Sequence, residues 1–165
     1  MVWLGKRNKI KDSIDIADKY LQIAKDDESA AAILKQSGYY NQAGYLYIQA
    51  MEKYIKHHIG QRVNLNIQYY AEEMGRTIGH SLNSALELFI KIYAADNKTL
   101  YEQMMQQLKS NVLQNIDFKY LHNKTRYPMY DKRYSDYVYL EFSKKDCVQI
   151  ENILANLKKY LQQVK

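Results

Sequence analysis

Residues 38–60 constrain the fold more than any other part of the sequence. At about 100° per residue, a helix here forms two adjacent apolar stripes: Tyr40, Ala43, Tyr47, Ala50 and Tyr54 in one, and Gly44, Ile48, Met51, Ile55 and Ile59 in the other. Together the stripes cover roughly 180° of the helix, against roughly 100° on a surface helix. We therefore predict the central helix of a bundle, with a solvated arc formed by Gln42, Gln49, Glu52, Lys53 and Lys56.

Composition narrows the class of protein. The 165 residues include one proline and six glycines, too few for a turn-rich β fold. Cys147 is the only cysteine, which excludes a disulfide framework and a cysteine-rich metal site. No apolar run approaches the roughly 18 residues of a membrane span, and the N-terminal residues lack the apolar core of a signal peptide, so we expect a cytoplasmic protein. The net charge of +6 favours an anionic partner only weakly, since a solvated basic surface is the commoner explanation of such a charge.

The N-terminal part predicts two helices before the central one. Asp12 is a candidate N-cap for a helix whose inner face carries Ile14, Ala17, Leu21 and Ala24. The acidic run at residues 26–28 interrupts this pattern, and Ser29 is the expected N-cap of a short separate helix ending at Gln36.

Later helices are indicated by apolar periodicity and by capping sequences. One helix is expected to begin near residues 79–81 and to end near 95–97, and Thr99 with Glu102 forms a possible capping box for the next. Ser143 with Asp146 is a second capping box, at the start of the last helix. Within residues 61–75, only residues 63–69 alternate like a strand; we expect an extended or irregular connection there, with a lone strand as the alternative. Residues 119–139, with the only proline at 128, are expected to form a loop.

The predicted fold class is therefore all-α, an antiparallel bundle of four to five helices. We expect residues 1–28 to be an N-terminal helical extension and residues 29–165 to form the bundle domain.

Several motifs in this order resemble the HEPN domain, a small helical bundle. Gly38-Tyr39-Tyr40-Asn41-Gln42-Ala43, followed by Ala50-Met51-Glu52-Lys53, is similar to the glycine–aromatic–alanine start and the A-x-E-K helix of that family. Gly79-His80-Ser81-Leu82 lies where many members have a His-Asp-Leu helix start. Arg126-Tyr127-Pro128 and the Ser143 cap resemble the family's Arg-Tyr-Pro turn and last helix. The likeness covers residues 29–165.

The resemblance implies a homodimer with a nucleotide- or RNA-related role. Members that cut RNA carry an arginine followed by four to six residues and a histidine, but no histidine follows His122 in this chain. The nearest match, Arg76 to His80, has three intervening residues. We therefore expect a non-catalytic binding module. The alternatives are a divergent, metal-independent ribonuclease toxin that uses Arg76, His80 or Arg126, and an interaction partner of a minimal nucleotidyltransferase.

The best candidate site is the basic, tyrosine-rich segment near the single proline. Basic side chains can neutralise phosphates while tyrosine rings stack on unpaired bases. The alternative is a loop held on the bundle by its tyrosines, with its arginines paired to Asp131 and Asp136. The predicted nucleotide- or RNA-binding residues are His122, Lys124, Arg126, Tyr127, Tyr130, Lys132 and Arg133.

Two histidine sites remain open from sequence. His80 with Arg76 could bind phosphate at a helix N-terminus or simply cap that helix. His57 and His58 could include a buried base or a metal ligand, but neighbouring helical side chains diverge by about 100° and cannot easily share one metal. A packed, hydrogen-bonded histidine is the favoured interpretation. No sequence motif indicates a cofactor or a metal cluster.

Overall fold

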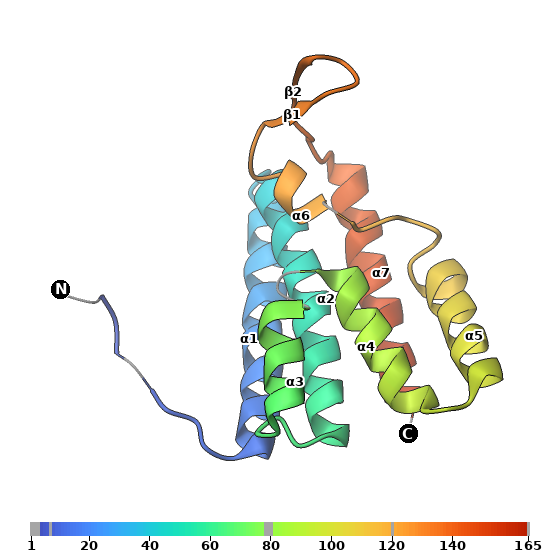
Figure 1. Ribbon diagram of the computed structural model, residues 1–165. Helices are drawn as coiled ribbons and strands as arrows, with labels where there is room; N and C mark the ends of the chain where they lie inside the picture. Colours follow the sequence, from blue (N-terminus) through green and yellow to red (C-terminus); the bar gives the residue numbers. More distant parts are fainter. Residues whose placement is uncertain (1–3, 7, 78–80, 120, 165) are drawn as a thin grey trace.

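The computed structural model describes residues 4–6, 8–77, 81–119 and 121–164. It is mostly helical, as predicted. Three long helices lie side by side, with α1 antiparallel to α2, and α4 and α5 cover one flank (Figure 1). The helices are α1 Ser13–Gln36, α2 Tyr40–Arg62, α3 Gln68–Glu72, α4 Leu82–Ala94, α5 Lys98–Gln107, α6 Leu121–Lys124 and α7 Lys144–Gln163. Two π-helical turns, η1 Glu73–Thr77 and η2 Leu108–Val112, and two short strands, β1 Met129–Asp131 and β2 Asp136–Val138, complete the described part.

Helix α2 is the central helix, as the two apolar stripes predict. All stripe residues except the half-buried Tyr40 are buried, and α2 packs against α1, α7 and α4. Two glycines let neighbouring parts of the chain approach α2 closely. A Cβ on Gly60 would lie 2.7 Å from Ala17 Cβ of α1, and a Cβ on Gly44 would overlap the Phe142 ring. Gly38, with φ of 83°, occupies the left-handed conformation that reverses the chain between α1 and α2.

The solvated arc predicted on α2 is wrong at three positions. Gln49, Glu52 and Lys56 are buried, because α1 covers this face of the helix. Lys56 Nζ lies 2.7 Å from Glu52 Oε1 and also lies over the Tyr20 ring of α1. This part of the arc is therefore a buried polar contact, whereas Gln42 is exposed and Lys53 is half-buried.

The predicted break in the first helix is also wrong. Asp12 caps α1 as expected, but α1 continues through residues 26–28. Ser29 lies within the helix, and its hydroxyl donates to the Lys25 carbonyl. The expected domain boundary at residues 28 and 29 therefore lies inside α1.

The capping predictions had mixed outcomes. Ser143 and Asp146 form the predicted reciprocal capping box of α7, and Ser81 caps α4. The predicted box at Thr99 is wrong, because Asn97 accepts the Leu100 amide and becomes the N-cap of α5.

Two connections contain more structure than expected. The connection predicted as extended or irregular at residues 61–75 contains α3 and the start of η1. The loop predicted at residues 119–139 contains α6 and an antiparallel hairpin in which Tyr130 pairs with Tyr137. Among the described residues, no helix is both long and apolar enough to cross a membrane.

Candidate nucleic-acid interface

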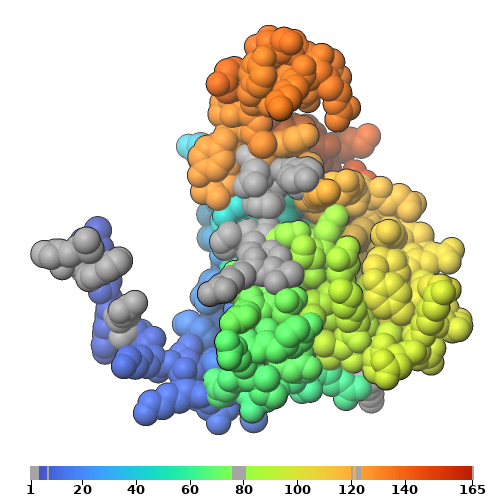
Figure 2. Space-filling view, in the orientation of Figure 1, coloured from blue at the N-terminus to red at the C-terminus, as the bar shows by residue number. Residues whose placement is uncertain are grey.

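The predicted basic and tyrosine residues gather at one end of the bundle. Here α6 meets the N-terminal part of α2, and the β1–β2 hairpin projects beyond the helices (Figure 1). Figure 2 shows this hairpin as an orange knob. We define the basic–tyrosine surface as Tyr45, Lys124, Arg126, Tyr127, Tyr130, Lys132, Arg133, Tyr134 and Tyr137.

Arg126 is held between two tyrosines from different elements. Its guanidinium carbon lies 4.9 Å from the ring centroids of both Tyr45, on α2, and Tyr127. Nη2 donates to the Tyr127 hydroxyl at 2.9 Å. Stacking on aromatic faces orients a guanidinium while leaving its remaining N–H groups available to an anion.

An open hollow adjoins this arginine. Asn41, Gln42, Tyr45, Thr125, Arg126 and Tyr127 line about 330 Å³ of space. A guanidinium group beside aromatic rings and amide side chains is chemically suited to bind a phosphate or a nucleotide.

The hairpin presents its aromatic rings to solvent. Tyr130 and Tyr137 form a T-shaped cross-strand pair, with ring centroids 5.5 Å apart. Tyr137 is 69% exposed, and Tyr134, in the turn, is 71% exposed. Lys132 and Arg133 are exposed in the same turn. Large exposed rings beside cations are unusual on a surface with only a solvating role.

The alternative prediction pairs the arginines with Asp131 and Asp136, and the described hairpin uses these carboxylates differently. Asp131 Oδ1 accepts the backbone amide of Arg133 at 2.9 Å, and Asp136 Oδ1 accepts that of Tyr137 at 2.7 Å. Asp131 therefore stabilises the turn of the hairpin, and Asp136 bonds to the backbone of β2.

The base of the hairpin is tied to α2 and α6. Asn41 accepts the Phe142 amide through Oδ1 and donates through Nδ2 to the Tyr139 hydroxyl. The Leu140 amide donates to the Lys124 carbonyl, and the Phe142 ring fills the space beside Gly44. These contacts fix where the hairpin leaves the bundle.

The other predicted residues are only partly placed. Lys124 is half-buried on α6, and Arg126 is exposed. The structure describes only the backbone of Arg76 and of His122, and His80 lies outside the described residues. The proposed pair of Arg76 and His80 is therefore untested by the geometry.

His57 has the packed, hydrogen-bonded setting favoured from sequence. It is buried, and its Nδ1 lies 2.9 Å from the Ala17 carbonyl oxygen. Burial and the neighbouring His57 lower the pKa of His58 to about 4. Among the described residues, no group of three or more His, Cys, Asp or Glu side chains could hold a metal ion.

A half-buried set of polar contacts between α1, α2 and α7 was not predicted. Glu28 receives hydrogen bonds from Lys158 and from the Tyr54 hydroxyl, the latter at 2.6 Å. Glu151 is bonded in the same way by Lys35 and Tyr47. Burial acts to raise the pKa of Glu151, but these two bonds outweigh it and hold the pKa below its ordinary value. Because the partners are far apart in sequence, only a correct alignment of the three helices could have revealed these contacts.

Comparison with known proteins gives no assignment. No family model matches the chain, and no curated protein or solved structure matches it.

Proposed function

We propose that the chain is a HEPN-like, non-catalytic protein that binds single-stranded RNA through the basic–tyrosine surface. The observation that carries this proposal is the placement of Arg126 between Tyr45 and Tyr127, next to a hairpin whose tyrosines and cations face solvent. The HEPN assignment rests on the order of the sequence motifs. Dimerisation, which the resemblance implies, remains a prediction that sedimentation velocity can test.

The charges of the segment support an anionic ligand. Residues 119–139 contain five lysine or arginine residues and two aspartates, and both aspartates bond to backbone amides. Arg126, Lys132 and Arg133 can therefore contact phosphates. With three such contacts, a fourfold rise in salt should weaken binding to a single strand by about 20-fold.

The exposed tyrosines support a single-stranded ligand. Unpaired bases present their faces for stacking, whereas the bases of a duplex are already stacked on each other. Replacing one stacking ring should weaken binding by about fivefold or more.

Fluorescence anisotropy of a labelled oligouridine, at about 50 and about 200 mM salt, tests the proposal. Arg126→Ala should weaken binding about tenfold and reduce the salt dependence, because it removes one phosphate contact. The matched control is Arg62→Ala, since Arg62 lies 4.9 Å from the Tyr93 ring centroid at the other end of α2.

Tyr134→Ala tests base stacking separately, with the 58% exposed Tyr69 as the control position. Tyr134→Ala should weaken binding, whereas Tyr69→Ala should not. The proposal fails if the wild-type chain shows no binding at low salt, or if the two controls weaken binding as much as the site variants. RNA cleavage by the wild-type chain that is lost in His80→Ala would favour the ribonuclease alternative.

A further inference from the structure

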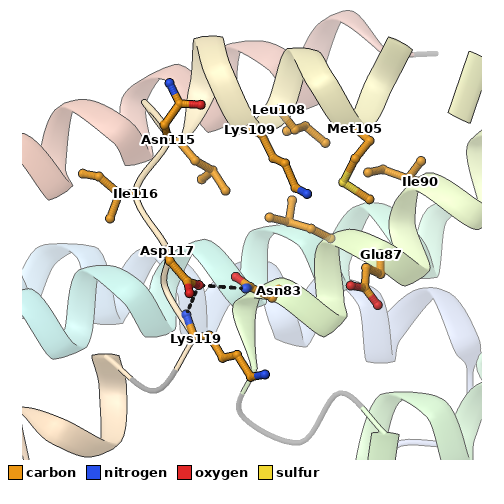
Figure 3. Close-up of a pocket in the computed structure, with 12 residues that line it drawn as sticks. Asn83, Glu87, Ile90, Met105, Leu108, Lys109, Asn115, Ile116, Asp117 and Lys119 are labelled. Atoms are coloured by element: carbon orange, nitrogen blue, oxygen red, sulfur yellow. Dashed lines mark hydrogen bonds between the residues drawn. The ribbon is translucent and has the colours of Figure 1, made fainter. Parts of the chain in front are cut away.

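A hollow on the opposite flank of α4 from α2 is unrelated to the basic–tyrosine surface. It lies between α4, the α5–η2 segment and residues 113–119, and encloses about 370 Å³ (Figure 3). None of its lining residues belongs to the basic–tyrosine surface. Its volume lies within the range of small-molecule sites. We call it the α4–η2 pocket.

The floor of the α4–η2 pocket is apolar. Ile90 and Leu108 are at most 1% exposed, and Leu86 and Leu113 are buried beside them. Half-buried Met105 and Ile116 also line the pocket. This combination of buried floor and partly exposed wall suits the apolar body of a small ligand.

One end of the pocket holds a fixed carboxylate. Asp117 Oδ1 accepts the Lys119 amide at 2.8 Å and the Asn83 side-chain amide at 3.2 Å. These two hydrogen bonds hold the pKa of Asp117 below its ordinary value. Asp117 therefore stays ionised and is fixed at this end of the pocket.

Lys109 is a positively charged residue of the pocket wall. Figure 3 shows its side chain reaching from η2 toward α4, whereas the carboxylate of Glu87 points away from η2. An ammonium group above an apolar floor attracts an anion and repels a cation.

We propose that the α4–η2 pocket binds a small amphipathic organic anion, whose apolar body covers Leu86, Ile90 and Leu108 and whose anionic group pairs with Lys109. A medium-chain carboxylate has this chemistry. A neutral molecule of the same shape gains the apolar contact but not the ion pair.

Three probes with one common alkyl body test the charge preference: octanoate, octanol and octylammonium. In NMR titrations of the full chain, octanoate should bind most tightly and octylammonium most weakly. The largest chemical-shift changes caused by octanoate should fall on the methyl groups of Leu86, Ile90 and Leu113. Shifts confined to other residues, or binding of octylammonium as tight as that of octanoate, would overturn the proposal.

Two variants locate the site. Lys109→Met should weaken octanoate binding about fivefold and leave octanol binding unchanged, because it removes one partly exposed ion pair. The matched control, Lys98→Met on α5, should change neither, since Lys98 does not line the pocket. Met105→Trp should weaken octanoate and octanol alike by filling the space.

The variants also separate this proposal from RNA binding. Arg126→Ala should bind octanoate normally, and Lys109→Met should bind RNA normally. Equal octanoate affinity of Lys109→Met and wild type would show that the anion does not contact Lys109 and would end the proposal.

Discussion

The two sides of α2 are built from different interactions. Toward α1 and α7, the contacts include Asp27 with Lys53, Glu28 with Tyr54, and Glu151 with Tyr47. On the other side, every buried residue of α4 is apolar. A polar contact described between α2 and α4 is that of the Arg62 guanidinium with the Tyr93 ring. Apolar contact is non-directional, whereas each polar pair is made in only one alignment. We infer that the α4 side contributes mainly stability and that the α1–α7 side specifies the alignment of the helices.

The largest expected effect is on the apolar side. Phe89 is fully buried in the core, and Phe89→Ala should lower the free energy of unfolding by about 4 kcal/mol through lost burial and a cavity. Urea denaturation measures this change. Leu100→Ala, at a 37% exposed position on α5, is the control and should have a much smaller effect.

A buried charge on the α1 side should give the next largest effect. Glu52→Leu leaves Lys56 without its 2.7 Å partner, and should lower the free energy of unfolding by about 3 kcal/mol. The double variant Glu52→Leu/Lys56→Met removes both charges and should recover most of that loss. A double variant no more stable than the single one would mean that the pair itself contributes net stability.

Close packing of α1 on α2 predicts a smaller effect. A Cβ at residue 60 would lie 2.7 Å from Ala17 Cβ and 2.9 Å from Leu65 Cδ1, so Gly60→Ala should cost about 2 kcal/mol of unfolding free energy. Gly75→Ala is a matched control, because no atom lies within 4 Å of its added Cβ. If both substitutions change the denaturation midpoint equally, residue 60 is not tightly packed against Ala17 and Leu65.

The smallest effect concerns pH. The pKa of His58 is about 4 in the folded chain and near 6.5 when unperturbed, so the unfolded chain binds more protons between these values. Stability should therefore rise with pH across this window and be lost as pH falls. When the free energy of unfolding is measured by denaturation at several pH values, its slope against pH should be shallower for His58→Gln than for wild type. Parallel slopes would contradict the depressed pKa.

The parts of the fold that could be predicted depend on local signals. The stripes of residues 38–60 and the Ser143 capping box need only helical periodicity and neighbouring hydrogen-bond partners. The acidic run at residues 26–28 could not be interpreted locally, because Asp27 and Glu28 find their partners on α2 and α7. The same tertiary contact with α1 buries Glu52 and Lys56.

Prediction of the candidate site was similarly divided. Arg126 and the hairpin tyrosines were recognised from composition, since basic and aromatic residues cluster in sequence. The contribution of Tyr45 was not predicted, because Tyr45 lies 81 positions before Arg126 and meets it only when α2 and α6 pack together. The α4–η2 pocket had no sequence signal, since its floor looks like any other apolar helix face.

Residues 139–142 attach one end of the basic–tyrosine surface to α2. Asn41 and the space beside Gly44, which the Phe142 ring fills, hold the base of the hairpin. Its turn at residues 132–135 is exposed. The base of the hairpin, which is attached to α2, and its exposed turn are therefore separate parts. Substitutions at residues 132–135 should therefore leave the stability of the helices unchanged, and under the proposed function they would alter only the affinity for RNA.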